Sequence, residues 1–568
     1  MAPPPRRRLR FLWVYIALAG QASVALAGSD QSFSDRQLRE HHHSAVEDVL
    51  STIVGVIHKA TEDHHEKPPQ RDVGLACMLL GSVGFVMLLF YIVNWKDDDI
   101  RLYAWTIIST TTCLFTAVLS FSGIKVISEL VFTVPEDMEG LQCLRGYVIF
   151  LIAFSILQLA SKMVSGAYCD CCCPSDMAKE SWVVADGLRA DHGDEVHEHQ
   201  VRTKRAHRSV AVIDGVEVFV EKRRLNLERN MTNARAWSQL LAHLSGFAAL
   251  QAGGALQHME WFRESPARAF LAVLINQLGI GALFRGMDIF RRATIIHWED
   301  ERVEILENCI EEAENDIVSL ASSFLTVQCL RFALSGVLPD DEGRVEPYQP
   351  VGMTSIVMLI VCGAGGLCAS ILLTCIPCSS KVATWLIQKI QNILGMSFAW
   401  CSLWGVHMFM RETQIFQSWL GTTLYPNERH VVAALLLSSC SLAAIRLLDL
   451  IQDMGATFPR VLQNMINVFS VLIGLSWEMC FEGGVSELAE ETRHPETMKL
   501  TFTICAVAIV LPAWRMFIVM RVMHLERKDQ ERKEARRKIQ SGEDPAAYLS
   551  LALQPSNRDV MTAPSDEE

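Results

Sequence analysis

The sequence lacks the motifs that mark most nucleotide-driven pumps and many hydrolases. It contains no G-x-x-x-x-G-K-[ST] phosphate loop, no H-E-x-x-H, no G-x-S-x-G and no dinucleotide-binding fingerprint between a strand and a helix. It also lacks an excess of positive charge, because the formal net charge is −13. These absences argue against ATP-driven transport by this chain alone, and they give no sign of nucleic-acid binding.

Cysteine is missing from residues 28–72, although the chain has 17 cysteines in all. Most of these 17 cysteines fall within apolar runs, where cysteine acts as a small polarisable core residue. We therefore predict no disulfide framework.

Long apolar runs are what the sequence has in abundance. Half of the residues are hydrophobic, and the mean hydropathy is +0.21. Runs of membrane-spanning length lie near 73–94, 104–124, 146–166, 237–257, 268–288, 318–338, 352–376, 384–408, 430–450, 461–481 and 499–521. Arg331 interrupts the sixth, and a charge at mid-bilayer costs roughly 2.5–3.5 kcal/mol. The pattern predicts an all-α polytopic transmembrane bundle of about eleven spans.

Charges around the spans predict the orientation of the chain. Residues 1–27 have a basic start, a short apolar run and an Ala25-x-Ala27 site typical of a cleavable signal peptide, with an uncleaved anchor as the alternative. Basic residues then gather in the loop 167–236 and at the start of the tail 522–568, whereas loops on the other side are acidic. We predict a luminal N-terminus and a cytosolic C-terminus, in the plasma membrane or an endomembrane of the secretory pathway.

Four stretches outside the spans have patterns of their own. Residues 28–72 are His-rich and contain an amphipathic helix, and residues 289–317 form an acidic helix. In the cytosolic loop 167–236, SVAVIDGVEVFVEK predicts a β-hairpin around Asp214-Gly215. The tail 522–568 is basic and then loose.

Spans 1–5 and 7–11 share a similar order of marker residues. Trp105 and Trp385 begin spans 2 and 8, and Arg145 and Arg429 begin spans 3 and 9. This rhythm suggests two parallel five-span halves, a known transporter architecture. The alternative is that arginine recurs near the cytosolic helix ends by chance, without any repeat.

Polar and aromatic residues within the last spans are candidates for a solute path. Glu478 follows Trp477 in span 10, where it is either a cation or proton ligand or an interfacial group near the luminal boundary. In span 8, Trp400, Trp404 and His407 share one helical face, so they either line a path or pack between helices.

Span 9 adds a charged pair to these candidates. Arg446 and Asp449 stand three residues apart, so they can pair with each other, while Arg446 can also reach the lipid headgroups.

Histidine and cysteine clusters lie outside the spans. The weak metal-site candidates are His41, His42, His43, His64, His65, His192, His197 and His199. A pH-responsive surface or plain solvated loops are the alternatives. Juxtamembrane Cys169, Cys171, Cys172 and Cys173 are candidates for lipidation, with a thiolate metal site as the alternative. The sequence indicates no particular cofactor.

The segment Gly474-Leu-Ser-Trp-Glu-Met-Cys-Phe481 resembles an S-W-E-x-x-F type motif near the end of a group of uncharacterised multi-pass membrane proteins of dinoflagellate and related protists. The resemblance covers these eight residues and the multi-span plan, and it implies no activity.

The leading hypothesis is movement of a small solute or cation across the bilayer, by a secondary transporter or channel. The first alternative is a non-transporting sensor or scaffold that binds cytosolic proteins, and the second is a membrane-embedded transferase.

Overall fold

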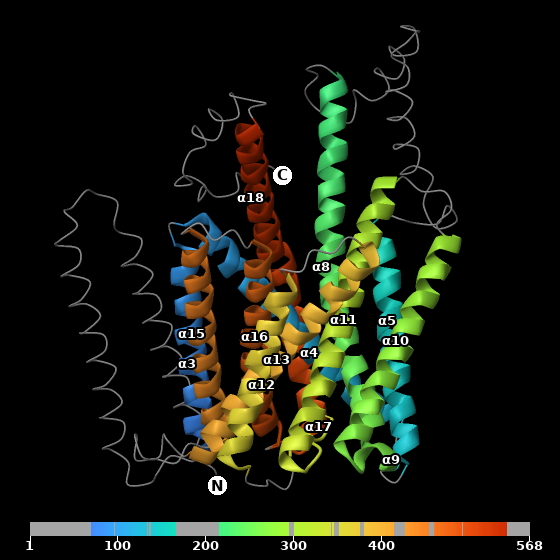
Figure 1. Cartoon of the computed structure of the whole chain (residues 1–568), viewed down its shortest axis with the longest axis vertical. Coiled ribbons are helices and arrows are strands. Elements are labelled where there is room, and N and C mark those ends of the chain that lie inside the picture. The colour runs from blue at the N-terminus through green and yellow to red at the C-terminus, as the bar shows by residue number, and fades with distance from the viewer. Residues whose placement is uncertain are drawn as a thin grey trace, which may run out of the picture. The chain divides into compact units, whose positions relative to one another are not determined.

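The computed structural model describes residues 70–95, 97–132, 135, 138–165, 215–294, 300–341, 343–345, 351–374, 380–413, 426–453, 459–490 and 492–541. The chain divides into two compact units, Met1–Pro69 and Gln70–Glu568, and all described residues belong to the second. Every regular element in the described part is a helix, which confirms the predicted all-α class (Figure 1).

The helices form one bundle of mostly long elements. In chain order they are α3 (Gln70–Val93), α4 (Asp98–Val131), α5 (Glu139–Ser165), α8 (Gly215–His258), α9 (Glu260–Arg263), α10 (Pro266–Thr294), α11 (Asp300–Ser335), α12 (Met353–Thr374), α13 (Lys381–Thr413), α15 (Pro426–Asp453), α16 (Pro459–Glu490), α17 (Pro495–Ala513), the π-helix η1 (Trp514–Val519) and α18 (Met520–Ser541).

Nine helical segments of the described part are long and apolar enough to cross a membrane. They coincide with nine of the eleven predicted spans, the second, the third and the fifth to the eleventh. The first predicted span falls on α3, whose apolar stretch Met78–Val93 is shorter, and the fourth falls within α8. The count of eleven therefore stays a prediction.

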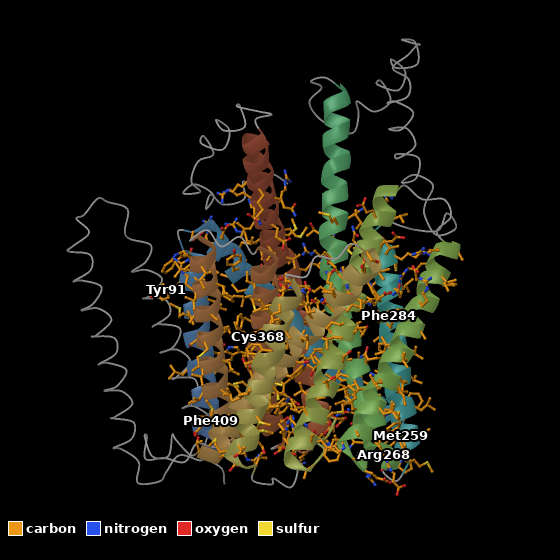
Figure 2. All side chains as sticks on the ribbon, viewed as in Figure 1. Tyr91, Met259, Arg268, Phe284, Cys368 and Phe409 are labelled. Atoms are coloured by element: carbon orange, nitrogen blue, oxygen red, sulfur yellow. The ribbon has the colours of Figure 1, made fainter. Side chains whose placement is uncertain are left out.

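Large apolar side chains cover the outside of the bundle. Leu278, Ile509 and Leu372 are 75%, 73% and 67% exposed. Figure 2 shows how densely such side chains surround the helices, with Tyr91 among those labelled. Soluble monomers rarely expose apolar patches larger than a few hundred Å². The bundle is thus compatible with a multi-pass membrane protein whose apolar surface is covered by lipid.

Polar contacts gather at the two ends of the bundle. At one end, here called the α18 end, Arg446 pairs with Asp97 at 3.8 Å. At the other, here called the far end, Arg263 pairs with Glu139 at 3.1 Å, and Arg344 with Glu482 at 2.9 Å. These pairs are largely exposed, so each stabilises the fold by about 0–1 kcal/mol.

Helix α11 joins two elements that the sequence predicts separately. The acidic stretch, predicted over 289–317, joins span 6 from residue 300 onward in one continuous helix from Asp300 to Ser335, whereas residues 289–294 belong to α10. Of its apolar stretch, 78% is buried against other helices, the highest fraction among the nine membrane-length segments of the described part. This central position explains why Arg331 is tolerated there, since the helix exposes little surface to lipid.

The predicted β-hairpin around Asp214-Gly215 is wrong for the part that the structure describes. Helix α8 begins at Gly215, so VEVFVEK, the second predicted strand, forms its first turns instead. A two-stranded hairpin is marginal on its own, whereas a helix here continues directly into the buried part of α8. The first strand lies outside the described residues.

Helices α5 and α8 pack closely along much of their length. At Gly146 the backbones approach so closely that a Cβ would lie 3.0 Å from the Cα of Ala252. Small residues at helix crossings allow such approaches in membrane bundles.

Valine at position 146 is therefore expected to destabilise the protein by about 2 kcal/mol, because the backbone of α8 must move to accommodate it. Thermal unfolding in detergent measures the effect. The control is Gly140→Val on the same helix, where a Cβ meets nothing within 4 Å. Equal melting temperatures for the two variants would contradict this account of the crossing.

Candidate functional site

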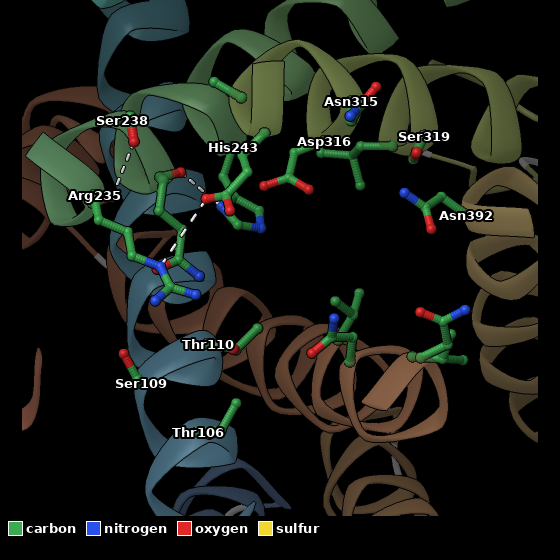
Figure 3. Close-up of a pocket in the computed structure, with 18 of the residues that line it drawn as sticks. Thr106, Ser109, Thr110, Arg235, Ser238, His243, Asn315, Asp316, Ser319 and Asn392 are labelled. Atoms are coloured by element: carbon green, nitrogen blue, oxygen red, sulfur yellow. Dashed lines mark hydrogen bonds and ion pairs between the residues drawn. The ribbon is translucent and has the colours of Figure 1, made fainter. Parts of the chain in front are cut away.

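A cavity of about 330 Å³ lies inside the bundle, among α4, α8, α11, α13, α16 and α18. Its wall is mostly polar, although α4, α11, α13 and α16 each contain a segment apolar enough to cross a membrane. Seven amide side chains line it: Gln239, Asn315, Gln388, Gln391, Asn392, Asn464 and Asn467. Figure 3 shows Asp316, His243 and Asn392 pointing toward the open space from three different helices.

The mouth of the cavity is at the α18 end. Arg235 of α8 lies 2.6 Å from Glu526 of α18 and 4.0 Å from Glu312 of α11, so its guanidinium connects three helices. The side chains of Arg235 and Glu312 are 43% and 63% exposed. Solvent therefore reaches the cavity from this end.

Asp316 lies one helical turn after Glu312 in α11, and its side chain faces the interior of the cavity. Its carboxylate forms no hydrogen bond or ion pair with the described residues. The wall as a whole carries one guanidinium and three carboxylates, those of Glu312, Asp316 and Glu526. With these groups ionised, the cavity has an excess of two negative charges.

Several hydrogen-bond donors of the wall are already used within the protein. Gln391 donates from Nε2 to Thr374 Oγ1 at 3.0 Å, and the Ser238 hydroxyl donates to the carbonyl oxygen of Arg235 at 3.0 Å. His243 Nδ1 lies 2.8 Å from the carbonyl oxygen of Gln239. Because a carbonyl only accepts, Nδ1 carries the hydrogen in neutral His243, and Nε2 is left as an acceptor.

The helix that runs through α17, η1 and α18 is irregular beside the cavity. Pro512 cannot donate a backbone hydrogen bond, and a π-helical turn follows it at Trp514–Val519. The indole of Trp514 donates to the carbonyl oxygen of Ser109 at 3.1 Å and lies 3.2 Å from its Oγ. The hydrogen bond links the π-helical turn to the cavity wall, because Ser109 of α4 and Val519 of η1 both line the cavity.

Aromatic packing closes the bundle between the cavity and the far end. Phe324 lies edge-on against Trp400, with ring centroids 4.9 Å apart, and both are buried. Farther along α11, the guanidinium of Arg331 stacks 4.3 Å above Trp404 and donates to the carbonyl oxygen of Gly343 at 2.7 Å. A smaller cavity of about 100 Å³, lined by Arg331 and Ser355, lies at the far end.

None of the predicted path residues lines the large cavity. Trp400 and Trp404 belong to the closure just described. Trp477 is buried, donates from Nε1 to Ser438 Oγ at 3.0 Å, and stacks on Phe85 with ring centroids 4.8 Å apart. Glu478 is half-buried on α16.

The predicted pairing of Arg446 with Asp449 is confirmed. Their side chains lie 2.5 Å apart at the α18 end, and Asp449 is buried. Arg446 also lies 3.8 Å from Asp97. The pair thus joins the end of α15 to the segment before α4.

His407 is brought together with a histidine that the sequence pattern does not single out. Its ring centroid lies 4.8 Å from that of His430 and 6.5 Å from that of Trp404. Nε2 of His407 and Nδ1 of His430 are buried without a hydrogen-bond partner among the described residues.

The histidine candidates for a metal site and the cysteine candidates for lipidation lie outside the described residues: His41, His42, His43, His64, His65, His192, His197, His199, Cys169, Cys171, Cys172 and Cys173. Within the described residues, no group of three or more His, Cys, Asp and Glu side chains is arranged to hold a metal ion.

A search for charged and aromatic residues misses the amides that form most of the wall. A usable signal is present, because Gln388, Gln391 and Asn392 recur at helical spacing in α13, as do Asn464 and Asn467 in α16. Amides with such spacing inside apolar spans indicate a polar helix face turned toward the bundle interior.

The chain matches no protein-family model, no curated protein and no solved structure. The resemblance carried by residues 474–481 thus stays a prediction. The geometry of the cavity is what supports a function.

Proposed function

We propose that the chain moves a small hydrophilic solute across a membrane, and that the large cavity receives this solute from the α18 end. The observation that carries the proposal is the polar wall, to which α4, α11, α13 and α16 contribute, although each contains an apolar segment of membrane-spanning length.

A polar wall of this kind is costly unless it has a use. Buried amides, hydroxyls and carboxylates lose their hydration, and in a membrane they are found mainly where they line a water-filled path or a binding site. Phe324 and Trp400 close the far side, while solvent reaches Arg235 and Glu312 at the mouth. A site open to one side only is one of the states that alternating access requires.

The π-helical turn at Trp514–Val519 supports a moving part. Such turns are frequent at functional sites, and both they and prolines are common points where a helix bends. Here the turn borders the cavity through Val519 and contacts Ser109 through Trp514. A change in its geometry would alter the shape of the wall directly.

The orientation and the two-halves plan belong to the same proposal. We place the α18 end in the cytosol because α18 contains the basic run ERKDQERKEARRK, and positive charge favours that side. Parallel halves around an axis along the membrane normal would suit a transporter.

Tryptophan at Asn392, on the cavity wall, is expected to reduce flux at least tenfold, because the indole would occupy the space that the solute needs. Proteoliposomes loaded in turn with labelled erythritol, serine and putrescine, together with K⁺ current, provide the assay. The control is Leu372→Trp on the exposed face of α12, which adds an indole of the same size without entering the cavity.

Equal flux in Asn392→Trp and Leu372→Trp would show that the solute does not pass through the cavity. Absence of flux for every probe in the native protein would overturn the transport proposal and favour the sensor or scaffold alternative.

A further inference from the structure

We infer that the cavity binds a small organic cation that donates N–H hydrogen bonds, with Asp316 as its anchoring carboxylate. This inference rests on the proposed function and narrows the class of solute.

Charge is the first argument. The single guanidinium of the wall, that of Arg235, already lies within 4.0 Å of two carboxylates. Asp316 has no such partner among the described residues, yet it faces the cavity between membrane-length helices. A carboxylate removed from bulk water is strongly stabilised by an opposite charge, and a cleft with an excess of one charge concentrates the opposite ion. The missing partner is therefore a cation.

Hydrogen bonding is the second argument, and it distinguishes kinds of cation. Internal bonds use the amide hydrogen of Gln391, the hydroxyl of Ser238 and the Nδ1 hydrogen of His243. The Asp316 carboxylate and the His243 Nε2 atom can only accept, and Asn315 Oδ1 is buried without a hydrogen-bond partner among the described residues. A cation that donates N–H hydrogen bonds, as an ammonium or guanidinium group does, would satisfy these acceptors, and the other amides of the wall would be left to bind its polar substituents.

Size is the third argument. A volume of about 330 Å³ is at the lower end of the roughly 300–1,000 Å³ typical of ligand pockets. Aromatic rings for cation–π recognition of quaternary ammonium groups are absent from the lining, whose apolar members are aliphatic. The wall thus favours a compact primary amine with polar substituents over a bulky quaternary ammonium ion.

Calorimetric titration of the full chain in lipid nanodiscs tests the inference with three probes of similar size. These are 4-aminobutan-1-ol, which is a cation with N–H donors, choline, which is a cation without them, and the neutral butane-1,4-diol. We expect the amine to bind at least tenfold more tightly than the other two. Asp316→Asn should abolish this preference, and Asp316→Glu should retain it. Glu307→Gln is the matched control, because Glu307 is an exposed carboxylate on the same helix outside the cavity.

Each other result overturns the inference. Equal affinity for the diol would remove the charge requirement, and equal affinity for choline would remove the donor requirement. Competition by K⁺ that depends on Asp316 would identify an inorganic cation site, and absence of binding by all probes would leave no amine site. If Asn392→Trp blocks the flux of erythritol or serine while Asp316→Asn does not, the transport proposal stands and the cation inference fails.

Discussion

Alanine at Gly343 is expected to destabilise the protein by about 3 kcal/mol, more than alanine at any open glycine position. Gly343 has φ +83°, and a Cβ there would lie 2.5 Å from Cζ2 of Trp404. The left-handed backbone costs a non-glycine residue about 1–2 kcal/mol, and overpacking adds about 1–3 kcal/mol. The ring of Trp404 cannot retreat freely, because the guanidinium of Arg331 lies against it.

Gly336→Ala separates these two contributions. Gly336 has φ +75°, but a Cβ there meets nothing within 4 Å. This variant should therefore show only the backbone cost of about 1–2 kcal/mol. Apparent melting temperatures of both variants, measured at one scan rate because membrane proteins often unfold irreversibly, provide the comparison. Equal shifts would mean that the ring of Trp404 moves aside easily and that the closure at the far end is loose.

Much of the fold could be predicted from the sequence because lipid imposes a simple rule on the chain. A helix that crosses the bilayer must be long and apolar, so the segments from 104–124 to 499–521 stand out in composition, and nine of the eleven runs coincide with helices of membrane-spanning length. Helix α8 is not apolar enough to be counted among these segments. The residues that it buries include the polar residues Ser238, His243 and Ser245. Ser238 and His243 hydrogen-bond to backbone carbonyl oxygens of α8 itself, and neighbouring helices cover all three side chains in place of lipid.

The prediction of a β-hairpin was wrong because contacts elsewhere in the fold decide the local structure. The alternation in VEVFVEK describes a local preference for strand, but the same residues continue into α8, and tertiary context overrides propensity. Sequence patterns also separated the acidic stretch 289–317 from span 6, because charge changes sharply there while the helix does not end.

The candidate site was much less predictable than the fold. Asp316 lies in an acidic stretch where a carboxylate is unremarkable in sequence, and only the packing of α11 against α8 and α13 turns it toward a cavity. Conversely, Trp477 attracts attention by its setting beside Glu478, yet it stacks on Phe85 within the core. Which face of a helix is turned inward depends on neighbours far away in the chain, and apolar spans have little periodicity to reveal it.

Methionine at Arg331 is expected to increase hydrogen exchange of the amides between 336 and 345 at least tenfold, while the global melting temperature changes little. Arg331 is buried, and its contacts with Gly343 and Trp404 hold this segment against the bundle. A desolvated cation–π contact stabilises by about 2 kcal/mol, and a hydrogen bond from a charged donor by about 1.5–3 kcal/mol. Methionine loses both, but it also removes the cost of keeping a guanidinium away from water, so the two effects largely cancel for the whole fold.

Exchange measured by mass spectrometry on the protein in nanodiscs distinguishes this local release from global unfolding. Arg344→Met makes the same chemical change within the segment, but the Arg344–Glu482 pair is well exposed, so less than a twofold effect is expected. Lysine at 331 should give an intermediate result, because an ammonium keeps the charge but lacks the planar group that stacks on an indole. Unchanged exchange in Arg331→Met would mean that other contacts hold the segment, such as the hydrogen bond from Gln328 Nε2 to the carbonyl oxygen of Asp340 at 2.9 Å, and that Arg331 is not what fixes the far end.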